Sequence, residues 1–163
     1  MVILGIDPGT ATVGYGLIKK TGRDVAAIDY GCIETSSTLS PGERLKIIHE
    51  SISKIIEKHS PKLMAVENVY FFKNLKTAMP VSQAKGVILF TAANASIPVF
   101  EFTPLQMKMA ITGYGKAEKK QVQKMIKIML GLEEKPLKKD RRKDDATDAL
   151  GIALCCAIKN NFL

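Results

Sequence analysis

Four acidic residues have the spacing expected of a metal-dependent hydrolytic site. Asp7 and Glu67 each follow a short apolar run, and Asp145 and Asp148 lie three residues apart in a segment with helical periodicity. A spacing of three places the second pair on one helix face. Converging carboxylates repel one another unless a proton or a cation lies between them. Oxygen-only ligands suit Mg²⁺ or Mn²⁺ better than Zn²⁺. These residues therefore predict a magnesium site.

Such a site would support the cleavage of phosphodiester bonds. Two ions roughly 3.5–4 Å apart activate a water molecule and stabilise the leaving oxygen, so the protein needs no nucleophile of its own. The chain has only two histidines, His49 and His59, and both belong to an amphipathic helical segment. We expect both of them to be solvated and to have no catalytic role.

Each acidic residue also has an ordinary structural explanation. Asp7 precedes a Pro-Gly pair and is a turn former. Glu67 could pair with a lysine as a partly buried acid. Asp144, Asp145 and Asp148 could serve as N-cap and first-turn charges, which the helix dipole favours. The metal hypothesis prevails only if one topology brings the acids together.

The hydrophobic pattern predicts such a topology. We expect strands over 2–7, 14–19, 25–35, 63–67 and 97–102. We expect helices over 41–59, 80–95, 104–111, 117–130 and 144–160. The first three strands form an antiparallel meander, and right-handed crossovers place the other two parallel to the first. This predicts a ribonuclease H-like α/β fold, in which a mixed five-stranded sheet is flanked by helices. We expect residues 1–163 to form a single domain.

The charge distribution predicts a polyanionic partner. The chain has 24 Lys and Arg against 16 Asp and Glu, a net charge of +8. Much of the basic excess falls within 116–127 and 135–143. A basic domain with clustered lysines is typical of nucleic-acid binding.

Composition also predicts a cytoplasmic protein. No apolar run approaches the roughly 20 residues that a membrane-spanning helix needs, and the N-terminal segment lacks the features of a signal peptide. The three cysteines show neither disulfide nor metal-ligand spacing. We therefore expect no membrane association.

Beyond these physical features, the sequence resembles the RuvC family of bacterial Holliday junction resolvases across almost the whole chain. Seven motifs in order and at matching spacing carry the resemblance: Gly-Ile-Asp-Pro-Gly-Thr from Gly5, Gly-Tyr-Gly from Gly14, Ala-Val-Glu-Asn-Val-Tyr from Ala65, Gln-Ala-Lys-Gly from Gln83, Pro-Val-Phe-Glu-Phe from Pro98, Ala-Glu-Lys-Lys-Gln-Val-Gln from Ala117 and Asp-Ala-Thr-Asp-Ala-Leu from Asp145.

The resemblance implies a structure-selective endodeoxyribonuclease that resolves four-way DNA junctions in homologous recombination and DNA repair. It assigns the catalytic and metal-binding roles to Asp7, Glu67, Asp145 and Asp148, and it favours Asp145 over Asp144. The implied cofactor is Mg²⁺, with two ions per site, for which Mn²⁺ can substitute. The implied partners are junction DNA, a second copy of the chain in a homodimer, and a branch-migration motor.

The resemblance also assigns DNA contacts. Lys108 and Lys119 correspond to residues that contact or position the DNA backbone near the cut. Tyr70 stands where the family carries an aromatic residue, most often Phe, that stacks on bases at the junction. The segment Glu133 to Lys143 departs from the family pattern because it is longer and more basic. It is either an additional phosphate contact or a solvated loop.

Three other functions remain to be weighed. An actin-like or sugar-kinase ATPase shares the Asp-x-Gly-Thr hairpin, but it needs two related domains, and 163 residues supply one. A ribonuclease H-like nuclease acting on RNA would keep the fold and the metal site. A junction-binding module without catalysis would require a defect in a site whose four acids are all present.

Overall fold

The computed structural model describes residues 1–68, 75–132 and 141–159. Five strands and five helices lie in these ranges. The strands are β1 (Val2–Asp7), β2 (Thr12–Thr21), β3 (Asp24–Glu34), β4 (Leu63–Glu67) and β5 (Val99–Phe102). The helices are α1 (Pro41–His59), α2 (Leu75–Asn94), α3 (Pro104–Thr112), α4 (Lys119–Met129) and α5 (Arg141–Lys159).

One mixed sheet forms the centre of the molecule, in the order β3-β2-β1-β4-β5. β2 is antiparallel to both β1 and β3. β4 is parallel to β1, and β5 is parallel to β4. The predicted ribonuclease H-like topology, an antiparallel meander followed by parallel strands, is therefore confirmed.

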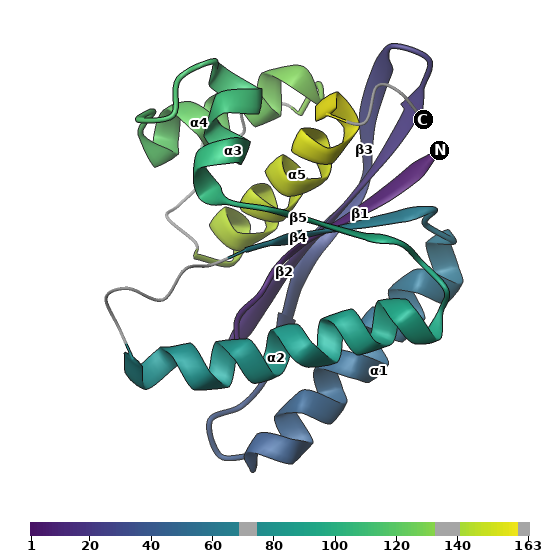
Figure 1. Cartoon of the computed structure of the whole chain (residues 1–163), viewed down its shortest axis with the longest axis vertical. Coiled ribbons are helices and arrows are strands. Elements are labelled where there is room, and N and C mark those ends of the chain that lie inside the picture. Colours follow the sequence, from purple (N-terminus) through teal and green to yellow (C-terminus); the bar gives the residue numbers. More distant parts are fainter. Residues whose placement is uncertain (69–74, 133–140, 160–163) are drawn as a thin grey trace.

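Helices cover both faces of the sheet (Figure 1). α5 crosses one face beneath α3 and α4, and α1 and α2 pack on the other. The side chains of β1 divide by the alternation of a strand. Ile3 belongs to the apolar core beneath α5, whereas Leu4 and Ile6 belong to the core beneath α1 and α2. The odd-numbered residues of β1 therefore face α5.

Local sequence signals account for where two helices begin. Ser40 caps α1 with a capping box that Glu43 completes, and Pro41 follows the cap. Thr103 and Gln106 form the same device at the start of α3, where Pro104 follows the cap. Because the α3 cap directly follows β5, it fixes the direction in which the chain leaves the sheet.

Some expected boundaries are wrong. α2 begins at Leu75, so Pro80 lies inside the helix and not at its first position. As the sixth residue of α2, Pro80 has a φ that suits the helix but lacks the N–H that would bond to the carbonyl four residues earlier, so the helix continues through it with one hydrogen bond fewer. α5 begins at Arg141, three residues before the expected start, and β5 begins at Val99, two residues later than expected.

Glycines on β1 and β2 let α5 lie almost directly on the sheet. A Cβ atom on Gly16 would stand 2.6 Å from the Leu150 backbone nitrogen, and one on Gly5 would stand 2.7 Å from the backbone nitrogen of Ala153. Gly14 meets the backbone carbonyl of Asp145 in the same way. These three glycines, Gly5, Gly14 and Gly16, form what we call the glycine seam. It fixes the height of α5 above the sheet.

None of the helices in the described part of the chain is long and apolar enough to cross a membrane.

The glycine seam predicts a sharp contrast between two glycine substitutions. Gly16→Ala should lower the free energy of unfolding by about 1–3 kcal/mol, because the new methyl group displaces α5 backbone that has no room to move. Gly42→Ala, on the open surface at the start of α1, should cause no loss and a gain of up to about 1 kcal/mol. Urea unfolding of both variants measures the difference. Equal stabilities would show that α5 does not depend on the seam.

Candidate metal centre

The sheet brings the first two acids together. Ile6 and Val66 are register partners in the parallel pair of β1 and β4, so Asp7 and Glu67 occupy the next position on each strand. Both follow a residue of the core beneath α1 and α2. By alternation, both carboxylates lie on the α5 face of the sheet, at the ends of neighbouring strands.

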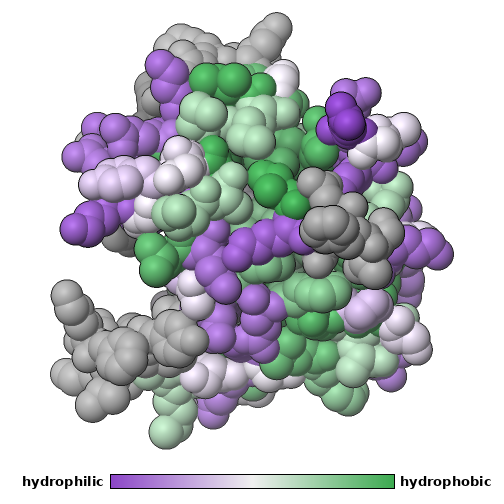
Figure 2. Space-filling view, turned by 45° about the horizontal axis from the view of Figure 1, so that its top comes forward, coloured by the Kyte–Doolittle hydropathy of each residue, from purple (hydrophilic) through white to green (hydrophobic). Residues whose placement is uncertain are grey.

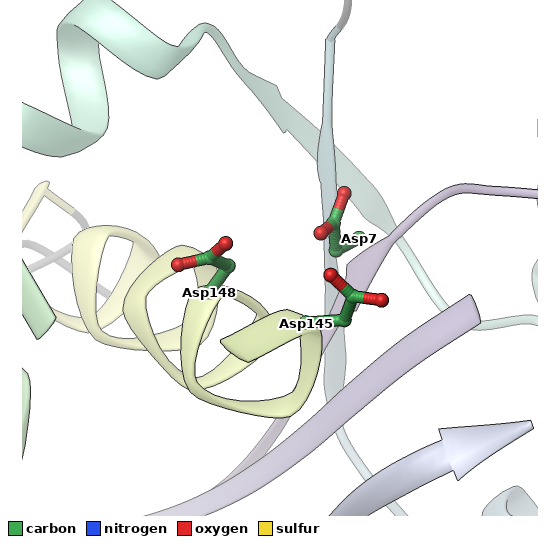
Figure 3. A group of neighbouring side chains, drawn as sticks. All are labelled: Asp7, Asp145 and Asp148. Carbon is green, nitrogen blue, oxygen red and sulfur yellow. The ribbon is translucent and has the colours of Figure 1, made fainter. Parts of the chain in front are cut away.

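α5 supplies the other two acids. Its backbone at Asp145 rests against Gly14 of β2, which sets the start of the helix beside the end of β1. Oxygen atoms of Asp7, Asp145 and Asp148 all lie within 4.8 Å of one another. Figure 3 shows Asp7 on β1 facing the two aspartates of α5. This geometry matches the predicted convergence, and the catalytic role of these residues stays a prediction.

The electrostatics of the cluster show strong repulsion in the absence of a cation. Burial, followed by the charges of Glu67, Asp148 and Asp145, raises the pKa of Asp7 to about 8. Burial also raises the pKa of Glu67, although its hydrogen bond with Asp7 opposes the increase. At neutral pH the metal-free pair therefore holds a proton on Asp7, which donates it to Glu67.

Two side chains of α4 hold Asp148. Lys119 Nζ lies 2.6 Å from Asp148 Oδ2, and Gln123 Nε2 donates to Asp148 Oδ1 over 3.3 Å. Burial lowers the pKa of Lys119, but its hydrogen bond and ion pair with Asp148, together with the charge of Asp144, raise the pKa overall. Lys119 remains about half exposed, with 56% of its side-chain surface accessible. It can therefore also reach a ligand from solvent.

Sequence reasoning singled out Lys119 and missed Gln123. The available signal was the spacing of four within the Ala-Glu-Lys-Lys-Gln-Val-Gln motif, which places both residues on one face of α4. Lys85 was also missed. It contacts Asn68 and Glu101 at the end of β4 and has no counterpart among the predicted site residues.

The remaining predicted DNA contacts are less defined. Lys108 lies on α3 with a half-buried side chain. Tyr70 and the segment 133–140 lie outside the described residues. Asp144 lines a cavity of about 420 Å³ together with Asp145, Lys119 and the loop 9–12. The cavity lies beside the other acids, and its lining includes two carboxylates, Asp144 and Asp145, and one ammonium group, Lys119.

A cysteine also lies near the acids. Cys32 on β3 is close enough to Asp145 for the charge of that carboxylate to affect its thiol. Burial, reinforced by that charge, raises the pKa of Cys32 to about 11. The group therefore stays a neutral thiol at neutral pH, and a neutral thiol is a poor metal ligand.

The expectation from the sequence that both histidines are solvated is wrong, because each has a side-chain partner. His49 Nδ1 lies 2.8 Å from Thr91 Oγ1, which donates to the Val87 carbonyl, so the imidazole is the donor to Thr91. His59 Nε2 lies 2.9 Å from Asp29 Oδ2. Neither belongs to the cluster of metal-ligating groups found in the described residues.

The donor set fits a hard divalent cation. The carboxylates of Asp7, Asp145 and Asp148 converge with Glu67 beside them, and oxygen is the ligand that Mg²⁺ and Mn²⁺ prefer. Burial, and after it the charges of the neighbouring acids, raises the pKa of Asp7, and a cation placed among the acids would offset the repulsion between them. The arrangement can thus hold a divalent metal beside the cavity that Asp145 lines.

Comparison with known proteins agrees with this geometry. A family model described as crossover junction endodeoxyribonuclease RuvC matches residues 3–156. The RuvC protein of Halothermothrix orenii is 52% identical over 155 residues, which are 95% of this chain and 91% of the relative. That of Thermosipho melanesiensis is 44% identical over 162 residues, which are 99% of this chain and 100% of the relative.

A solved structure agrees as well. The structure of T. thermophilus RuvC in complex with Holliday junction substrate has a TM-score of 0.89 and 32% sequence identity, and the match covers 98% of this chain and 94% of that one. The extent of these matches and the converging acids lead to one conclusion: the chain belongs to the RuvC family of crossover junction endodeoxyribonucleases.

Proposed function

We propose that this protein is a structure-selective endonuclease that resolves four-way DNA junctions by symmetric, metal-dependent hydrolysis of phosphodiester bonds, in homologous recombination and DNA repair. The observation that carries the proposal is the convergence of acids from β1 and α5 at the end of the sheet in a RuvC family member. Asp145 lines an open cavity beside the other acids, which gives a substrate one route to the cluster.

The four acids, Asp7, Glu67, Asp145 and Asp148, are the proposed ligands of Mg²⁺. Two bound ions would supply an activated water and would stabilise the leaving oxygen. Lys119 pairs with Asp148 in the metal-free site. A metal ion bound by Asp148 would neutralise its charge and leave the ammonium group of Lys119 available to a phosphate of the DNA backbone. Gln123 continues to fix the rotamer of Asp148 through its amide.

The DNA-binding surface extends over α4 and the turn before it. Lys116, Lys120 and Lys124 are exposed there, and Figure 2 shows hydrophilic side chains on the side of the molecule where α4 lies (upper left). Backbone phosphates attract such a surface without regard to sequence. We assign Lys108 and Lys119 to backbone contacts near the cut, and Tyr70 to base stacking at the junction centre.

A homodimer is the proposed working form. α2 presents an exposed stripe opposite its buried face, formed by Met79, Gly86 and Phe90, with accessible surfaces of 70% for Met79 and 62% for Phe90. A Cβ atom on Gly86 would meet nothing within 4 Å, so a neighbouring backbone can approach closely there. A second copy on this stripe gives a two-fold particle, which suits a two-fold junction.

Three other proposals are weaker. Cooperation with a branch-migration motor is supported by family membership alone. Action on RNA would use the same acids, and a difference would lie in contacts to the 2′-hydroxyl group. A non-catalytic binding role is disfavoured because the described acids lie close enough to share a cation.

Cleavage of a synthetic four-way junction tests the proposed activity directly. With Mg²⁺ we expect paired, symmetric nicks in the junction and none in matched linear duplex or RNA–DNA hybrid, and no cleavage with EDTA. Asp7→Asn should lower the rate by at least about a thousandfold, because the acids act as a unit, while junction affinity stays within about twofold. Cleavage of the hybrid alone would move the substrate to RNA, and a loss of binding by Asp7→Asn would indicate misfolding.

The repulsion within the cluster predicts an unusual pH dependence of stability. Asp7 has a folded-state pKa of about 8 against an ordinary 3.8, so between these values the folded protein keeps a proton that the unfolded chain has lost. The metal-free protein should therefore lose stability as pH rises from about 4 to about 8, by on the order of a few kcal/mol. Asp7→Asn should remove much of this loss, and saturating Mg²⁺ should offset it in the wild type.

Chemical unfolding of both proteins across this range, with and without Mg²⁺, gives the comparison. The difference between wild type and Asp7→Asn cancels the titration of groups elsewhere in the chain. A difference that stays constant with pH would contradict the assignment of the raised pKa to Asp7.

The α2 stripe predicts which substitution separates the two copies. Phe90→Asp should convert the dimer to a monomer and abolish paired cleavage, because it places a charge in an apolar interface. Tyr114→Asp, a matched change at an exposed aromatic residue between α3 and α4, should leave the dimer intact. Sedimentation equilibrium of the two variants measures whether each is a monomer or a dimer. A dimeric Phe90→Asp would place the interface elsewhere.

A further inference from the structure

A second polar cluster lies at the end of β4, behind the acids. Lys85 Nζ donates to Asn68 Oδ1 over 3.0 Å and forms an ion pair with Glu101. The side chain of Lys85 is only 20% exposed, against 37% for Glu101. The ammonium group of Lys85 therefore links three elements: α2, the end of β4 and β5. We call Lys85, Asn68 and Glu101 the rear brace.

The rear brace lies on the opposite face of the sheet from the carboxylates. Val66 belongs to the core beneath α1 and α2, and its register partner on β5 is Glu101, so the two side chains share that face. Asn68 is two residues beyond Val66 and follows the same alternation. Glu67 lies between Val66 and Asn68, and its carboxylate therefore points to the α5 face.

The end of β4 is where the site needs support. Glu67, the last residue of β4, extends its carboxylate toward the acids of β1 and α5. β4 is only five residues long. Beyond Glu67, the Asn68 amide donates to the Phe102 carbonyl over 2.8 Å, which extends the pairing with β5 by one further bond.

We propose that Lys85 is a positioning residue that fixes the end of β4, and with it Glu67, in the geometry needed for metal binding. It binds the side chain directly after Glu67 and ties it to β5 through Glu101. Because it acts from behind the sheet, its effect passes through the backbone of β4 and needs no contact with metal or DNA. The inference rests on the proposed function of the acids as metal ligands.

The decisive measurement is hydrogen exchange of the Asn68 amide in the metal-free protein. Lys85→Met keeps the length of the side chain and removes its charge. We expect exchange at Asn68 to accelerate about tenfold, because two charge-assisted hydrogen bonds are lost. The Met64 amide, which pairs with the Pro98 carbonyl at the far end of β4, provides an internal control and should exchange at the wild-type rate. Unchanged exchange at Asn68 would overturn the proposal.

Metal affinity gives the functional readout. Mn²⁺ titration, followed by electron paramagnetic resonance, should show about tenfold weaker binding for Lys85→Met, the size of effect expected for a support residue behind a ligand. Junction affinity in Ca²⁺ should stay within about twofold of wild type. Lys85→Arg should restore both metal affinity and slow exchange, because it keeps a charged donor. Wild-type Mn²⁺ affinity in Lys85→Met, or weakened junction affinity with intact metal binding, would contradict a positioning role.

A milder variant guards against misfolding. Glu101→Gln removes the counter-charge of Lys85 but keeps a side-chain oxygen that can accept its hydrogen bond, so it should accelerate Asn68 exchange by less than Lys85→Met. If the wild-type protein binds no Mn²⁺ at the acids, the proposed metal site is wrong. If the wild-type protein binds Mn²⁺ and Lys85→Met binds it equally well, only the proposed role of Lys85 is wrong.

Discussion

The close contact between α5 and the glycine seam is the constraint on which the rest of the structure depends. Side chains normally separate a helix from the sheet that it covers, and here their absence on Gly5, Gly14 and Gly16 brings two backbones together. The helix is buried along most of its length, so it has no freedom to lift away. Asp145 and Asp148 therefore reach the ends of β1 and β4, because the packing that stabilises the fold also assembles the acids.

The carboxylates that this packing brings together repel one another. Burial and neighbouring charges raise the pKa of Asp7 to about 8, so the metal-free site relieves its repulsion by holding a proton. Lys119 and Gln123 support Asp148 from α4. A cation held by these acids would replace the proton, and carboxylate oxygens that cannot move apart suit an ion that accepts several oxygen ligands. Stability and cation binding are thus coupled through the same contacts.

Much of this could be predicted from the sequence, because it depends on local patterns. Apolar runs that end on Asp7 and Glu67 specify strand ends, and parallel pairing of their strands brings those ends together. Gln123 and Lys85 could not be found in this way, since their partners depend on how α4 and α2 dock. Proline statistics misplaced the start of α2, which continues N-terminally past Pro80 to Leu75. The thiol of Cys32 near Asp145 was likewise a matter of strand register that no spacing reveals.

α2 links the two halves of the proposed mechanism. Its inner face packs on the sheet through Ala84 and Ile88, and its outer face carries the stripe that includes Phe90. Lys85, between these faces, reaches the end of β4. A second copy seated on the stripe would therefore contact the same rigid helix that supports Glu67. Because helices deform little along their length, α2 and the short path through Lys85 would couple the interface of such a dimer to the end of β4 that carries Glu67.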